Sequence, residues 1–132
     1  MAVLTRVQFQ FLDRLFYDAP ALQQAVEELR TIKKADAQES ADPTAREAVE
    51  CMAEIPAAMT YNRPEACLRV VKRTWEKYHG TPIGDAMCRR YKLREGWTRT
   101  VCVLFISEDT YFRWRREFIF SAAIFAAREK LL

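Results

Sequence analysis

Residues 97–118 read WTRTVCVLFISEDTYFRWRREF, and the second half of this stretch places arginines and aromatic rings on one predicted helix. Ser107 is a favoured N-cap residue, and the two acidic residues after it suit the positive end of a helix dipole. The spacing of Tyr111, Trp114 and Phe118 matches one face of an α-helix. The stretch therefore predicts a long helix that begins after Ser107, buries these rings and turns its arginines outward.

Residues 97–107, WTRTVCVLFIS, are the ambiguous part of this stretch. An apolar run that is rich in β-branched residues is compatible with a buried strand as well as with a helix. The chain offers no second strand, and a lone strand cannot satisfy its backbone hydrogen bonds. We therefore favour a short helix over residues 97–104, followed by a turn at 105–107.

A third helix is predicted directly before these two, over residues 82–93, with a turn at Gly96. A short helix followed by a longer one across a tight turn is typical of a helix-turn-helix, whose second helix lies in the major groove of DNA. Arginines on that helix can bind phosphates or the edge of guanine. Thr110, Phe112, Arg113 and Arg116 lie on the outer side or the shoulder of that helix, so its arginines are expected to face DNA, and Arg99 on the short helix is a further candidate.

The pattern W-x9-S-x2-TYFRWRREF, from Trp97 to Phe118, resembles the C-terminal helix-turn-helix of ArpU/RinA-type phage transcriptional regulators, which are similar to region 4 of sigma factors. The resemblance covers about a third of the chain, roughly residues 87–127, and implies sequence-specific binding of double-stranded DNA and activation of late phage genes. RNA polymerase is a possible partner. The resemblance implies that Tyr111 and Trp114 hold the recognition helix in place. It also implies the residues that face DNA, which are Thr110, Phe112, Arg113 and Arg116. The matching positions are Trp97, Ser107, Thr110, Tyr111, Arg113, Trp114 and Arg115.

Four residues of the short helix and its start depart from the family pattern. Gly96 stands where the family usually has a capping serine, and Thr100 stands where an aliphatic residue is expected. Cys102 and Val103 occupy positions that are normally polar and exposed. We therefore expect this outer face to be covered by the N-terminal helices or by a second subunit.

The composition predicts an all-α fold of about six or seven helices without a sheet. Half of the 132 residues are hydrophobic, and only three glycines and five prolines interrupt the chain. Apolar spacing predicts a helix over residues 3–17 that Asp18 and Pro20 end, and then a second helix from Pro20. An exposed loop (33–45), a helix (44–54) and a longer helix over 62–80, capped by Asn62 and Gly80, are expected to follow.

Charge divides the chain into two regions. Residues 1–59 contain 6 Lys and Arg against 10 Asp and Glu, whereas residues 60–132 contain 15 against 8. This asymmetry favours an acidic N-terminal region that packs or oligomerises and a basic helical region, with the helix-turn-helix at about 82–127, that meets phosphate. The large apolar residues of the N-terminal stripe and the C-terminal helix exceed what so short a chain can bury, which predicts a homodimer.

Other classes of protein find little support in the sequence. No membrane-spanning run or signal peptide is recognisable, so we expect a soluble cytoplasmic protein. The four cysteines lack metal-binding spacing and are expected to be reduced and buried, and His79 has no catalytic neighbour. No enzyme motif, metal or cofactor is predicted. Two alternatives stay open: a protein–protein adaptor that oligomerises through residues 118–132, and a phage DNA-packaging subunit.

Overall fold

A computed structural model describes residues 4–38 and 61–132, and these residues form an all-α fold without a strand. The expected helix over 44–54 and Cys51 lie outside the described residues. None of the described helices has the length and apolar composition that crossing a membrane requires. The helices are α1 (Arg6–Gln38), α4 (Pro64–Tyr78), α5 (Pro82–Tyr91), α6 (Trp97–Leu104) and α7 (Glu108–Arg128).

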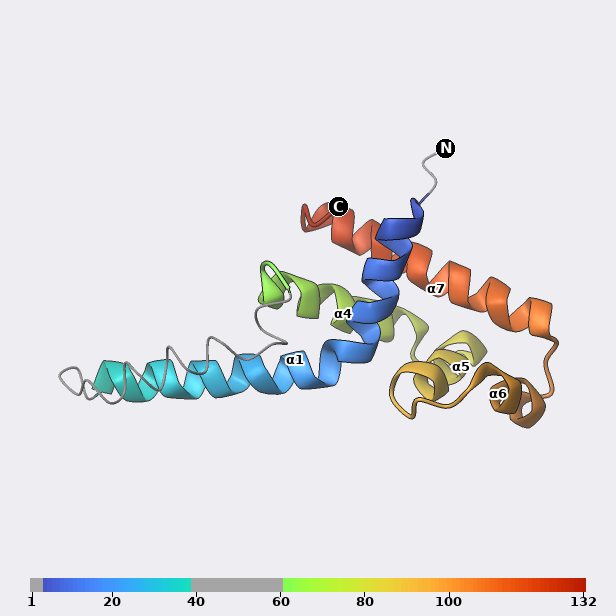
Figure 1. The fold of residues 1–132 in the computed structure, drawn as a ribbon, viewed down its shortest axis with the longest axis horizontal. Helices are drawn as coiled ribbons and strands as arrows, with labels where there is room; N and C mark the ends of the chain where they lie inside the picture. The colour runs from blue at the N-terminus through green and yellow to red at the C-terminus, as the bar shows by residue number, and fades with distance from the viewer. Residues whose placement is uncertain (1–3, 39–60) are drawn as a thin grey trace.

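Helices α4 and α7 form the centre of the fold, and the first half of α1 packs against both (Figure 1). Helices α5 and α6 lie beside the N-terminal half of α7, at the end of the molecule away from the second half of α1. These helices share one core, in which residues of α1 contact residues of α4 and α7 and the ring of Phe16 contacts that of Tyr91 on α5. Burial of these apolar side chains is the main force that holds the helices together.

The rings of this core surround Phe118, which is fully buried in the middle of α7. Its ring centroid lies 4.8 Å from that of Phe16 on α1 and 4.9 Å from that of Trp75 on α4. Tyr78 and Tyr91 complete the cluster at 5.3 and 5.9 Å. Phe118 thus joins helices α1, α4 and α5 to α7.

Helix α1 continues through Pro20, so the prediction that Asp18 and Pro20 end a first helix was wrong. A proline inside a helix removes one backbone hydrogen bond and bends the helix, and Figure 1 shows that α1 is bent. Leu22 and Val26 are buried in the core beyond the proline. Their burial stabilises the second half of α1 as a continuation of the first, so no separate helix begins at Pro20. The expected loop at 33–45 was also wrong for residues 33–38, which continue α1.

The longer predicted helix is α4, but its N-terminus differs from the expectation. Asn62 does not cap it; Arg63 occupies the N-cap position in a left-handed conformation, without a side-chain cap hydrogen bond. The carbonyl of Asn62 accepts a hydrogen bond from the thiol of Cys67 instead. At the other end, Gly80 has a φ of +74°, which confirms the predicted glycine stop.

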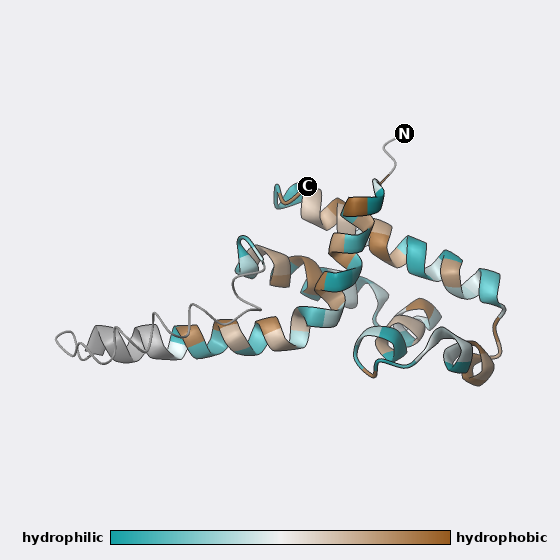
Figure 2. Ribbon diagram, viewed as in Figure 1, coloured by the Kyte–Doolittle hydropathy of each residue, from teal (hydrophilic) through white to brown (hydrophobic). Residues whose placement is uncertain are grey.

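The helical interpretation of the ambiguous stretch is confirmed, because residues 97–104 form α6. Its outer face is not covered as expected. Cys102 is exposed, Val103 retains 43% of its accessible surface and Phe105, in the turn that follows, retains 94%. Figure 2 shows this turn as a hydrophobic segment (brown) next to the hydrophilic first half of α7 (teal). Of the other cysteines described, Cys67 is buried and Cys88 half-buried.

Candidate nucleic-acid interface

Helices α5, α6 and α7 contact one another pairwise and form a three-helix unit at one end of the fold (Figure 1). The turn from α6 to α7 is tight because Phe105 adopts the left-handed conformation, with a φ of 56°, and the N–H of Ile106 donates to the carbonyl of Val101. Left-handed residues commonly end a helix in this way. Ser107, two residues after Phe105, is the N-cap of α7, which begins at Glu108.

Ser107 caps α7 as predicted. Its hydroxyl oxygen accepts a hydrogen bond from the backbone N–H of Thr110 at 3.1 Å and donates one to the hydroxyl of Thr110 at 2.9 Å. Glu108 and Asp109 follow in the first turn, where negative charge offsets the helix dipole. The cap therefore fixes the start of the helix that carries the candidate arginines.

Replacing Ser107 by alanine is expected to lower the free energy of unfolding by about 1 kcal/mol, because the N–H of Thr110 loses its acceptor. Urea denaturation followed by circular dichroism would measure the change. Ser107→Asp is the matched control, since an aspartate also accepts this hydrogen bond and should remain close to the parent in stability. Equal losses in both variants would contradict the role of the cap.

A buried polar contact joins α6 to α5. The hydroxyl of Thr100, which is fully buried, donates to the carboxylate of Glu95 at 3.1 Å. The same carboxylate binds the guanidinium of Arg89 on α5 at 3.1 Å. Buried hydroxyl groups need such partners. Thr100 stands where the pattern of the ArpU/RinA-type regulators has an aliphatic residue. Its hydroxyl thus has a hydrogen-bond acceptor within the three-helix unit.

A second polar cluster joins the three-helix unit to α1, and its centre is Asp13. The carboxylate accepts a hydrogen bond from the hydroxyl of Tyr91 at 2.6 Å and forms ion pairs with Arg115 at 3.1 Å and Arg90 at 3.7 Å. Arg90 also donates to the hydroxyl of Tyr111 at 3.2 Å. Burial and, after it, the neighbouring Asp13 carboxylate raise the pKa of Tyr91. These contacts fix α7 between α1 and α5.

Arg115 is the one arginine of the run on α7 that faces inward. Its side chain keeps only 21% of its exposure, and its guanidinium lies over the ring of Phe9 at 4.9 Å. The aromatic-arginine pattern alone did not assign this role. The helical period offered a signal, because Arg115 follows Tyr111 by four residues on the inner face. Its partner Asp13 lies too far along the chain to be recognised by spacing.

The structure separates the five candidate residues. Arg113 and Arg116 are exposed on α7, and Arg99 is exposed on α6. Thr110 is half-buried and bonded to Ser107. Phe112 is also half-buried, with its ring centroid 5.6 Å from that of Trp97 and 5.2 Å from that of Tyr111. Among the described residues no acidic side chain pairs with these three arginines, which leaves them exposed to a ligand, whereas Phe112 supports the packing of α6 on α7.

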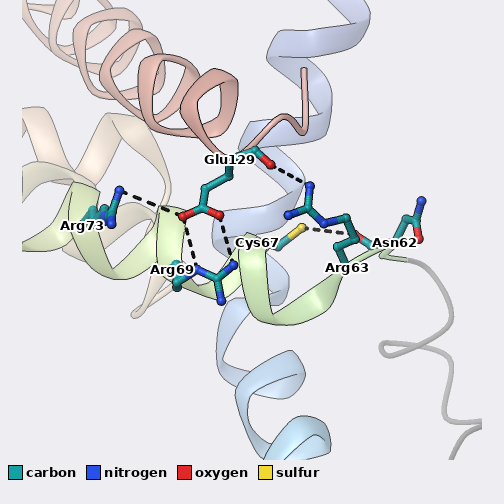
Figure 3. Close-up of polar contacts among 6 residues, drawn as sticks. All are labelled: Asn62, Arg63, Cys67, Arg69, Arg73 and Glu129. Atoms are coloured by element: carbon teal, nitrogen blue, oxygen red, sulfur yellow. Dashed lines mark hydrogen bonds and ion pairs between the residues drawn. The ribbon is translucent and has the colours of Figure 1, made fainter.

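A separate cluster holds the C-terminal end of α7 on α4 (Figure 3). Glu129 accepts two hydrogen bonds from Arg69, at 3.0 and 3.2 Å, and its backbone carbonyl accepts one from Arg63 at 2.6 Å. Arg73 lies 4.0 Å from the same carboxylate. The hydrogen bonds from Arg69 lower the pKa of Glu129. These arginines thus have an intramolecular acidic partner, which the described residues do not provide for the exposed arginines of α7.

Within residues 4–38 and 61–132, no group of three His, Cys, Asp or Glu side chains is placed to hold a metal ion. Comparison of the chain with protein-family models, with curated proteins and with solved structures found no match. The geometry of α5, α6 and α7 and the residues that these helices expose therefore provide the basis for a proposed function.

Proposed function

We propose that the protein is a non-enzymatic, double-stranded DNA-binding regulator of transcription that inserts the first turns of α7 into the major groove. The supporting observation is the exposure of Arg113 and Arg116 on a helix whose start is capped by Ser107 and whose inner face is fixed by Asp13. Arginines held on a rigid helix can bind phosphates and read guanine. Arg99, exposed on α6, adds a contact to the DNA backbone.

The resemblance to ArpU/RinA-type regulators supports the finer part of this proposal. On that basis the protein is encoded by a phage or prophage, acts in the cytoplasm at a specific operator and cooperates with RNA polymerase. Glu108, Asp109 and Glu117 are exposed on α7 as well. Their negative charges repel DNA phosphates and weaken non-specific binding. Affinity for DNA therefore has to come from a specific operator, at which the arginines make defined contacts.

Fluorescence anisotropy with duplex DNA, at two salt concentrations, tests the proposal. The parent is expected to bind, with an affinity that falls steeply as salt rises, because phosphate contacts release counterions. Random duplex serves first, and a library of sequences selected for binding then identifies the operator. A parent that binds no duplex DNA at low salt would remove the proposal.

Replacing Arg113 by alanine is expected to cost about 1–3 kcal/mol of binding free energy and to relax specificity at one base pair, if this arginine reads a base. Replacing Arg116, if it meets phosphate, should weaken all sequences alike and lower the salt slope by about one unit. Lys72→Ala is the matched control, because it removes one exposed positive charge from α4. Binding by both arginine variants that equals the parent's would contradict the helix-turn-helix mechanism.

A protein–protein adaptor is the second candidate, and exposed apolar residues of α7 favour it. Phe120 and Ile124 retain 47% and 41% of their accessible surface. Exposed residues of this kind mark interfaces when they lie together. The same anisotropy experiment separates the two functions, since an adaptor is expected not to bind duplex DNA and not to depend on Arg113 or Arg116.

A further inference from the structure

The second half of α7 carries an exposed stripe that the DNA-binding proposal does not use. The stripe consists of Glu117, Phe120, Ile124 and Arg128, all of them exposed. In an α-helix, residues spaced by three, four and four positions lie along one face. Among the described residues, neither Glu117 nor Arg128 forms a side-chain ion pair. The stripe thus has an acidic end, an apolar middle and a basic end.

The stripes of two antiparallel α7 helices are complementary, because the acidic end of each then faces the basic end of the other. In an antiparallel pair of α7 helices, Phe120 of one copy lies opposite Ile124 of the other, and Glu117 lies opposite Arg128. The register is the same for both contacts to within one residue. A two-fold axis requires such a self-complementary surface. We infer that a second copy of this chain covers the stripe, with the two α7 helices antiparallel and Glu117 of each copy paired with Arg128 of the other.

Another kind of partner fits the stripe less well. A membrane surface with anionic headgroups favours cations around the apolar residues, whereas Glu117 places an anion at one end of them. An unrelated protein would require no symmetry between the two ends. The stripe has that symmetry in both its charges and its apolar residues, which favours a second copy of the chain.

The antiparallel arrangement also spaces the two DNA-contacting segments. With a rise of 1.5 Å per residue and a centre near residue 122, the two copies of residue 113 lie about 27 Å apart along the helix axes, and those of residue 110 about 36 Å. These separations bracket the distance of about 34 Å between half-sites one turn of DNA apart. The dimer would therefore suit an operator with two-fold symmetry, a consequence that depends on the proposed function, whereas the dimer itself does not.

Sedimentation equilibrium of the full chain without DNA tests the inference. The parent is expected at twice the monomer mass of 15.5 kDa, and the variant with both Phe120→Asp and Ile124→Asp at the monomer mass. Circular dichroism would check that the variant is folded, which is expected because both residues lie on the exposed face of α7. A monomeric parent at high concentration would overturn the inference, as would a dimer that the double variant leaves intact.

Charge reversal tests the register. Glu117→Arg or Arg128→Glu alone is expected to raise the dimer Kd about ten-fold, because two ion pairs become two repulsive pairs. The variant with both changes should return to within about three-fold of the parent, since the pairs form again with exchanged charges. Glu108→Arg is the matched control, because it makes the same change on the opposite side of α7, and it should leave the Kd unaltered.

Failure of the double reversal to restore the dimer would overturn the antiparallel pairing. Because these measurements contain no DNA, they are independent of the proposed function. A parent that dimerises but binds no duplex DNA would remove the proposed function and retain the interface. A parent that binds DNA as a monomer would remove the interface and retain the proposed function.

Discussion

Replacement of Phe118 by alanine is expected to lower the free energy of unfolding by about 3–5 kcal/mol, which is at the upper end of the range for a single substitution. The ring is fully buried and lies within 6 Å of four other aromatic rings from α1, α4 and α5. Truncation removes these contacts and leaves a cavity at the point where four helices meet. Urea denaturation monitored by circular dichroism would measure the loss.

Two further variants make the result on Phe118 specific. Phe118→Leu keeps most of the volume and should lose less than half as much stability as the alanine variant. Val7→Ala removes an apolar group that is 75% exposed, so it should change stability by no more than about 0.5 kcal/mol. A loss below about 1 kcal/mol for Phe118→Ala would mean that the core is not built around this ring.

Replacement of Asp13 by asparagine is expected to cost about 3 kcal/mol of stability. The change keeps the shape of the side chain but removes the negative charge that faces both Arg90 and Arg115. Within the described residues, the Nε–H groups of these two arginines already lack hydrogen-bond partners. Removing one partner from a buried ion pair typically costs about 3–5 kcal/mol, and the partial exposure of these side chains places the effect at the lower end.

A double-mutant cycle would separate the ion pair from general packing. If Asp13 and Arg115 are coupled, Arg115→Met in the Asp13→Asn background should cost less than it does in the parent, because the charge it removes is no longer compensated. Asp85→Asn is the surface control, since Asp85 is exposed in the first turn of α5. Additive losses at Asp13 and Arg115 would contradict the coupling.

Several features of the fold followed from local patterns in the sequence. The apolar period of α7, its cap at Ser107 and the stop at Gly80 each depend on residues within about one turn of one another. The helical state of residues 97–104 followed from the absence of a partner strand. Hydrogen bonds and side-chain faces of a helix are determined over three or four residues, so a sequence pattern can report them.

Other features depended on contacts between residues far apart in the chain. A proline inside a helix commonly bends or breaks it, yet α1 continues through Pro20 because Leu22 and Val26 pack in the core. The inward role of Arg115 depends on Asp13, and the support that Phe112 gives α6 depends on Trp97. The sequence alone determined that residues 97–104 are helical and that α7 begins after Ser107, but not that α1 continues through Pro20 to Gln38. Within residues 4–38 and 61–132, only the tertiary structure decided that Arg115 of α7 is paired and that Arg113 and Arg116 are not. An ion pair such as Asp13–Arg115 joins two helices that are far apart in the sequence, and a local sequence pattern does not report which helices pack together.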